Sequence, residues 1–490
     1  MTGVRGARYL LLAYPLVQSL RFVTKIILGL LLGVADFGEV MQVGILIFFA
    51  SHFAYAGLDE ALVAADRLDR RTFARLRRFH VFSGLLAAVL AALAGAVLAW
   101  LLDRPSIQWL ALGLAPMIAL ANVSVLPMAL LVRQRRYRDA FWVDVAATIG
   151  LALATVYAAW LGAGAWSLVA GWYMNALIVV LLAERLARPS IAALPDDPAA
   201  GATAPLRSHG RRFLGSSVIG FLAQRADAFL VGAVLGPIAL GLYELAQYLA
   251  QAFAQYAVGL GERYLFPLFS DERRGGRLAP TFGHALRIAL VFVLPGHVLL
   301  ALVARPFVLL VFPDAWQGLW PILSALAIAA AFQCLELVPV NALKGAGWTH
   351  SVLRLSVIRV LLIMAAVLVS LRSGSATAVA VAVAAARAVS FAASLVLARH
   401  VIRELEPRHE FLKGIGTVLG WGMLLLPVVY LLDFASDATG AHSLLLLSVE
   451  VASATALWIL VRIAWDRAAF QREWQFVYRR VAAALVRGGT

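Results

Sequence analysis

Uncharged apolar runs long enough to cross a lipid bilayer recur from one end of the 490-residue sequence to the other. A transmembrane α-helix needs about 20 mostly apolar residues. Apolar side chains make up 62% of the chain and charged ones only 14%, whereas soluble domains contain roughly 45–50% and 25%. Such a chain has too few polar residues to cover a water-facing surface. The sequence therefore predicts an all-α polytopic membrane protein and excludes soluble, disordered and disulfide-stapled classes.

Charge clusters and Gly or Pro positions divide the apolar runs into about fourteen predicted transmembrane helices. Run length favours helices over barrel strands, which need only about ten alternating residues. The predicted spans are 9–33, 38–63, 79–102, 106–131, 140–161, 165–186, 213–235, 238–260, 284–304, 316–340, 351–371, 375–398, 414–432 and 442–463.

The positive charges fall almost entirely on one side of these spans. Most of the 42 Lys and Arg residues lie in the termini and alternate loops, while the opposite loops hold only Arg104, Arg305 and Arg372. Cytoplasmic loops carry an excess of Lys and Arg, so we expect both termini in the cytoplasm. The same rule accounts for the net charge of +15, and we expect no nucleic-acid partner.

The longest loop, rich in Pro, Ala and Gly, follows the sixth span and separates two six-helix halves. Beyond the last span, aromatic and basic residues alternate at helical spacing, which favours a helix on an anionic membrane surface. The expected organisation is an N-terminal lobe over 1–188, a cytoplasmic linker over 189–212, a C-terminal lobe over 213–400, two further helices over 401–463 and an amphipathic tail over 464–490.

The two halves share an internal repeat with an offset of 203 positions. Three glycines at the exit of the first span recur at the exit of the seventh; the pairs are Gly29 and Gly232, Gly33 and Gly236, and Gly38 and Gly241. A second echo pairs the stretch beginning at Pro127 with the stretch beginning at Pro339. An even number of helices in each half predicts a parallel repeat about an axis along the membrane normal.

Three blocks carry a family resemblance. They are Leu32-Gly-Val-Ala-Asp-Phe-Gly, Gly164-Ala-Trp-Ser-Leu-Val and Arg225-Ala-Asp-Ala-Phe-Leu-Val-Gly. Together, in this order and with the matching helix count, they resemble the polysaccharide-transport (oligosaccharide flippase) family of the multidrug/oligosaccharidyl-lipid/polysaccharide exporter superfamily. The resemblance spans nearly the whole chain.

The resemblance implies two six-helix lobes in a pseudo-two-fold arrangement around a central cavity, working by alternating access. It implies a flippase in the bacterial inner membrane that moves polyprenyl-pyrophosphate-linked oligosaccharide repeat units to the outer leaflet. The products would be O-antigen, capsule or exopolysaccharide. Membrane lipids and the polymerase and glycosyltransferases of the same pathway are further expected partners.

Cations inside the spans need an explanation, because a charge at mid-bilayer costs about 2.5–3.5 kcal/mol on insertion scales. Guanidinium groups can hold a pyrophosphate bidentately in a positively lined cleft. The alternative is that each cation pairs with a carboxylate to fix helix packing. The candidate substrate-binding residues are Arg21, Lys25, Arg225, Arg354, Arg359 and Arg387.

Carboxylates inside the spans are fewer. Asp227, Glu244 and Glu336 are candidates for ion coupling or for balancing the charge of the cavity. A role as structural salt-bridge partners stays open for each of them. Asp144, near the start of the fifth span, is a further in-span carboxylate without an assigned role.

The sequence contains no phosphate-binding loop, zinc-protease motif or nucleophile elbow. We therefore expect no enzyme, no cofactor and no metal site, and an energy source other than ATP hydrolysis by this chain. Three alternatives remain at this point: a lipid II flippase of peptidoglycan synthesis, a cation-coupled drug exporter of the same superfamily, and, more remotely, a membrane glycosyltransferase or polymerase.

Overall fold

The computed structural model describes residues 2–55, 62, 68–196, 221, 224–401 and 451–452. Regular structure within these ranges is entirely helical, without a β-strand. In the same ranges, nine helices are long and apolar enough to cross a membrane. The prediction of an all-α polytopic membrane protein is therefore confirmed, although the count of fourteen spans extends beyond the described residues. The described residues up to Gly241 form one compact unit, and those from Leu242 onward form another.

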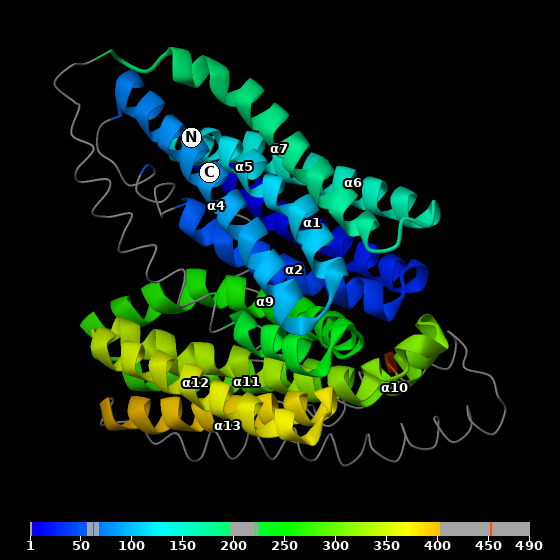
Figure 1. Ribbon diagram of the computed structural model, residues 1–490. Helices are drawn as coiled ribbons and strands as arrows, with labels where there is room; N and C mark the ends of the chain where they lie inside the picture. The colour runs from blue at the N-terminus through cyan, green and yellow to red at the C-terminus, as the bar shows by residue number, and fades with distance from the viewer. Residues whose placement is uncertain are drawn as a thin grey trace. The chain divides into compact units, whose positions relative to one another are not determined.

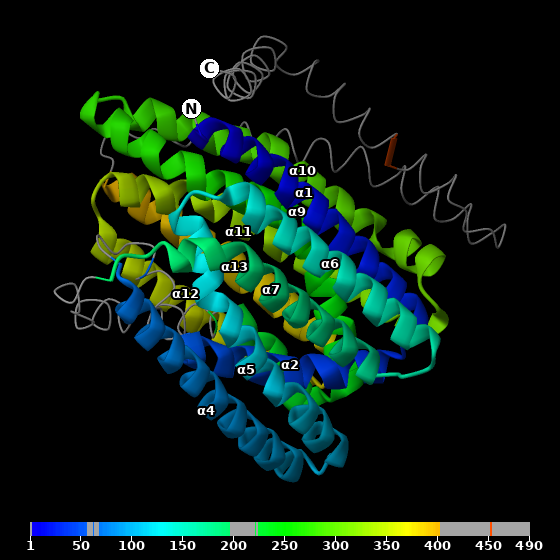
Figure 2. The ribbon, with the colours of Figure 1, turned by 90° about the horizontal axis from the view of Figure 1, so that it is seen from above.

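The first unit is a bundle of long helices (Figure 1). α4 and α5 lie side by side in both views (Figure 2), α1 packs against α6, α7 packs against α5 and α6, and α2 packs against α4 and α5. The helices are α1 (Thr2–Leu31), α2 (Val34–Tyr55), α4 (Arg70–Leu102), α5 (Pro105–Arg133), α6 (Tyr137–Trp160), α7 (Trp166–Ala192) and a helix over 224–235.

The second unit is built around α11, which packs against both α10 and α13, while α12 packs against α13. Its helices are α9 (Pro237–Arg274), α10 (Leu278–Val311), α11 (Leu319–Gly345), α12 (Thr349–Ser370) and α13 (Ala376–Val401). One buried cluster joins four of them through Phe269, Phe282, Leu335 and Phe391.

Helix ends follow local chemistry. Asp69 caps α4 by accepting hydrogen bonds from the backbone nitrogens of Arg71 and Thr72, each at 3.1 Å. Burial alone would raise the pKa of Asp69, but these hydrogen bonds outweigh it and hold that pKa below its usual value. Asp103 ends α4 in the left-handed conformation at φ 52°, and Pro105 starts α5 at a position where no backbone donor is needed. A tight hairpin results.

Most predicted helix ends lie close to the observed ones, and the two largest differences are at the start of α4 and the end of α9. The third span was expected to begin at 79, but α4 begins at Arg70. Likewise α9 continues to Arg274 and not to 260. Arginine is a good helix former, so these helices continue past the apolar segment into basic turns. The expected spans 414–432 and 442–463 (apart from 451–452), the tail over 464–490 and most of the linker lie outside the described residues.

The block around Gly164 shapes the turn between α6 and α7. Gly162 and Gly164 both adopt positive φ, at 78° and 52°, a region that side chains disfavour. Trp166 then lies so close to Gly113 of α5 that a methyl group on this glycine would come within 2.5 Å of the indole ring. This part of the family pattern therefore has a packing role within the first unit.

The 203-position offset relates the helix starts as well as the glycines. Gly33 separates α1 from α2, which begins at Val34, and Gly236 separates helix 224–235 from α9, which begins at Pro237. A methyl group on Gly38 would overlap the carbonyl oxygen of Pro237. Within the first unit, α2 therefore crosses the first turn of α9 at backbone distance.

Candidate functional site

Lys25 is the better buried of the two cations predicted on α1. Its ammonium nitrogen lies over the ring of Phe37, 4.9 Å from the centroid. Phe37 stands at the start of α2 and is 1% exposed. The negative face of an aromatic ring attracts a cation, so this contact stabilises the half-buried ammonium group, which also takes part in a further interaction within the chain.

Arg21 lies one turn before Lys25 on α1 and is exposed at the surface of the first unit. Its charge acts on the carboxylate of Asp144 on α6. The two helices pack together here, because Val17 of α1 contacts Phe141 and Val145 of α6. Sequence reasoning noted Asp144 but could not pair it, since no sequence signal says which helices are neighbours.

Helix 224–235 contributes Arg225, which is half-buried, and Asp227, which is 8% exposed. Neither side chain is free, because both take part in polar or electrostatic interactions within the chain. The role expected for Asp227 as a charge-balancing carboxylate stays a prediction.

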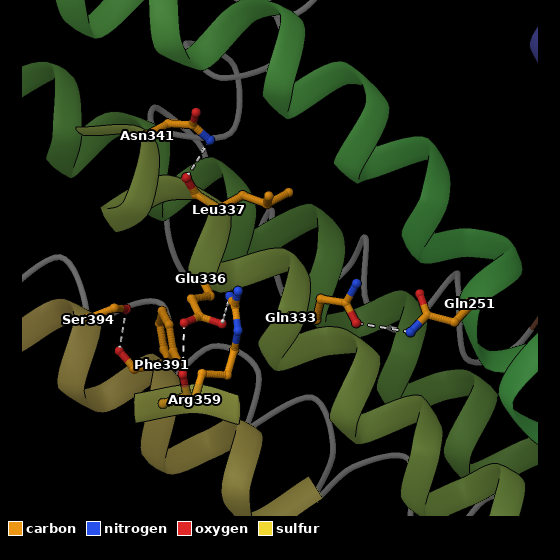
Figure 3. Close-up of polar contacts among 9 residues, drawn as sticks. Gln251, Gln333, Glu336, Leu337, Asn341, Arg359, Phe391 and Ser394 are labelled. Atoms are coloured by element: carbon orange, nitrogen blue, oxygen red, sulfur yellow. Dashed lines mark hydrogen bonds and ion pairs between the residues drawn. The ribbon is translucent and has the colours of Figure 1, made fainter. Parts of the chain in front are cut away.

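The second unit contains an ion pair between neighbouring helices, with a buried carboxylate (Figure 3). Nη1 of Arg359 on α12 lies 3.3 Å from Oε2 of Glu336 on α11. The hydroxyl of Ser390 on α13 donates to the other carboxylate oxygen at 2.8 Å. Glu336 is 2% exposed, and its two oxygens thus tie three helices together.

Glu336 was predicted as a charge-balancing carboxylate and Arg359 as a substrate-binding cation, and the structure brings the two together. A guanidinium carries five donors, and Arg359 uses one of them here, at a long distance. Its side chain keeps 27% of its surface exposed. The pair therefore holds the arginine in place and leaves most of its donors for another acceptor.

The other predicted residues of the second unit are more dispersed. Arg387 on α13 is half-buried and interacts electrostatically with Cys334 of α11. It lies three residues before Ser390 on the same helix, one turn from the hydroxyl that donates to Glu336. Arg354 is exposed on α12, whereas Glu244 on α9 is 7% exposed and has interactions within the chain.

Each unit thus carries its own set of cations, and each set includes a carboxylate that partly balances it. In the first unit the charge of Arg21 acts on Asp144; in the second, Arg359 pairs with Glu336. Such groups can hold a polyanion through charge-assisted hydrogen bonds. Among the described residues, no cluster of His, Cys, Asp and Glu could hold a metal ion. Sequence reasoning missed Ser390, whose only signal is its position three residues after Arg387.

Comparison with known proteins shows the family to which the chain belongs. A model of the polysaccharide biosynthesis protein family matches residues 27–321. The succinoglycan biosynthesis transport protein ExoT of Rhizobium meliloti (strain 1021) is 26% identical over 340 residues, which span 67% of this chain and 66% of that protein. The lipopolysaccharide biosynthesis protein WzxC of Escherichia coli (strain K12) is 21% identical over 337 residues, 66% of each chain. The matched region covers slightly less than two thirds of each relative.

A solved structure of the lipid II flippase MurJ, in an inward closed conformation, shares the fold. It superposes with a TM-score of 0.73 and covers 94% of this chain and 99% of its own, at 12% sequence identity. At that identity the likeness concerns the fold alone.

Proposed function

This chain belongs to the polysaccharide biosynthesis protein family, and from that premise we propose that it is a flippase for lipid-linked oligosaccharides. The proposed substrate is a polyprenyl pyrophosphate carrying an oligosaccharide repeat unit, moved across the cytoplasmic membrane by alternating access. The observation that carries the proposal is the combination of family membership with half-buried cations on the helices of each unit, namely Lys25 and Arg225 in the first and Arg359 and Arg387 in the second. Two relatives named for succinoglycan transport and lipopolysaccharide biosynthesis support it.

In this proposal the cations hold the pyrophosphate, and the sugars and the lipid tail occupy other surfaces. Guanidinium groups fit phosphate oxygens bidentately, and an ammonium acts as a point charge. The carboxylates keep the bundle from carrying an uncompensated positive charge when no substrate is bound. The cations proposed to bind substrate are Arg21, Lys25, Arg225, Arg354, Arg359 and Arg387, and the carboxylates are Asp227, Glu244 and Glu336.

The domain limits and the orientation are part of the same proposal. We place the N-terminal lobe at 1–188, the linker at 189–212, the C-terminal lobe at 213–400, the two further helices at 401–463 and the tail at 464–490. Both termini are proposed to lie in the cytoplasm because of the charge bias of the loops. The pathway's polymerase and glycosyltransferases are the proposed partners.

Two transporter alternatives are less well supported. A lipid II flippase would have the same fold, but the relatives ExoT and WzxC are named for surface polysaccharides. An exporter of cationic drugs would favour a carboxylate-lined site, whereas the half-buried charges of α1, α12 and α13 are cations. Bond-forming chemistry has no support in the motifs of the chain.

A deletion strain tests the proposal. Loss of the gene should abolish one surface polysaccharide and leave its lipid-linked repeat unit inside the cell, where an external glycosidase or periodate cannot reach it. Normal polysaccharide together with a defect in peptidoglycan precursors would favour the lipid II alternative and overturn the proposal.

A further inference from the structure

Three glutamines recur at every fourth position of α9: Gln247, Gln251 and Gln255. Side chains four residues apart share one face of a helix, so α9 presents a stripe of carboxamides. Gln251 donates from Nε2 to Oε1 of Gln333 on α11 at 3.0 Å, and the two side chains point toward one another in Figure 3. We refer to Gln247, Gln251, Gln255 and Gln333 as the amide band.

The amide band lies within the apolar part of the second unit. Gln333 is at the middle of α11, which is long and apolar enough to cross a membrane. The hydrogen bond to Gln251 places that part of α9 at the same level. All four glutamines are half-buried, so each is partly packed and partly accessible.

The hydrogen-bonding capacity of the band is largely unused. A carboxamide offers two donors and an acceptor oxygen with two lone pairs. Oε1 of Gln247 is buried and lacks a hydrogen-bond partner among the described residues, and the bond between Gln251 and Gln333 uses one donor and one acceptor. A buried polar atom without a partner is costly, so Oε1 of Gln247 favours a ligand that donates a hydrogen bond to it.

The chemistry of the band selects the class of ligand. A pyrophosphate calls for cations, a coupling cation calls for carboxylates, and a lipid tail calls for apolar side chains. Carboxamides are neutral and both donate and accept, which is also true of sugar hydroxyls. Resting on the function proposed above, we propose that the amide band binds sugar residues of the lipid-linked oligosaccharide, separately from the cations that hold its pyrophosphate.

Binding to two probes tests this assignment. The full-length protein is purified in lipid nanodiscs and titrated with sugar-free polyprenyl pyrophosphate. It is then titrated with the lipid-linked oligosaccharide fraction extracted from cells that carry its own pathway. Gln247→Met and Gln251→Met should each weaken binding of the sugar-bearing lipid about tenfold, equivalent to about 1.4 kcal/mol. Binding of the sugar-free lipid should stay within about twofold, which also shows that the variants are folded.

Asn341→Leu is the matched control. Asn341 is another amide of α11, buried, and its Nδ2 donates to the carbonyl of Leu337 in its own helix at 2.8 Å. This variant should keep the preference for the sugar-bearing lipid. Equal weakening of both probes by the glutamine variants, or no weakening of either, would overturn the sugar subsite and leave the flippase proposal standing. Failure of the wild type to bind either lipid would instead contradict the flippase proposal.

Discussion

Gly38 of α2 and Gly241 of α9 stand so close that a methyl group on Gly38 would lie 2.9 Å from the backbone nitrogen of Gly241. The contact is reciprocal under the internal repeat. A methyl group on Gly38 would overlap the carbonyl oxygen of Pro237, and one on Gly241 would overlap the carbonyl oxygen of Val34. Gly38 and Gly241 are 203 positions apart, and so are Val34 and Pro237. The crossing of α2 with the start of α9 is therefore itself two-fold symmetric.

Alanine at either glycine should destabilise the protein. Gly38→Ala and Gly241→Ala each force two backbones apart, and overpacking of this kind typically costs about 1–3 kcal/mol. Thermal melting of the purified protein should show a lowered Tm for both. Gly296→Ala on α10 is the control, because among the described residues no atom beyond the adjacent backbone of its own helix lies within 4 Å of the added methyl group. If Gly38→Ala melts like the wild type, close backbone approach is not required.

Arg359 and Glu336 should be coupled in their effect on the stability of the protein. Removing both should restore stability but not export. Arg359→Met leaves a buried carboxylate without its cation, which typically costs about 3–5 kcal/mol. The double variant Arg359→Met with Glu336→Leu should recover most of that stability, since apolar replacement of a whole buried pair is often neutral. Export should stay lost in the double variant because the phosphate contact is gone. A stable double variant with normal export would remove Arg359 from the substrate site.

Arg21, Lys25 and Arg225 should each be needed for export. Alanine at any of them should abolish surface polysaccharide while the protein still accumulates in the membrane, as measured by immunoblot and glycan staining of a complemented deletion strain. Arg21→Lys should be partly active, since lysine keeps the charge and loses the bidentate geometry. Arg71→Ala is the control, because Arg71 forms an exposed pair with Asp196 and such pairs contribute about 0–1 kcal/mol. Normal export by all three alanine variants would exclude these cations from substrate binding.

Reporter fusions should reveal the orientation set by the loop charges. Fusions after Arg71, Arg136, Arg274 and Arg403 should report the cytoplasm, and fusions after Ser106, Gly162 and Ser373 should report the outside. The reason is that Lys and Arg near span ends are retained on the cytoplasmic side. A reversed signal at Arg71 or Arg136 would contradict the orientation of the first half.

The sequence predicted the existence of the spans better than their pairing. Apolar run length is a property of each segment alone, so the helices containing Arg21 and Arg359 could be placed without knowing their neighbours. The contact between Arg359 and Glu336 joins positions 23 apart on two helices, and the bond from Ser390 to Glu336 joins positions 54 apart. Helical periodicity gives the face on which a side chain lies, but it does not say which helix packs there. The start of α4 was missed because its first turns are basic and not apolar.

Flipping by the purified protein is the decisive measurement for the proposed function. The protein is reconstituted into vesicles with the lipid-linked oligosaccharide in the inner leaflet, and arrival in the outer leaflet is followed by accessibility to an added glycosidase. A transmembrane potential or an Na⁺ or H⁺ gradient is imposed without ATP; each elementary charge that crosses contributes about 2.3 kcal/mol per 100 mV. We expect protein-dependent flipping whose rate responds to the potential or to a gradient, and we expect Arg21→Ala to abolish it. Flipping that ignores potential and gradients but accelerates when ATP is added to this protein alone, or no flipping by the wild type under any condition, would contradict the proposed function.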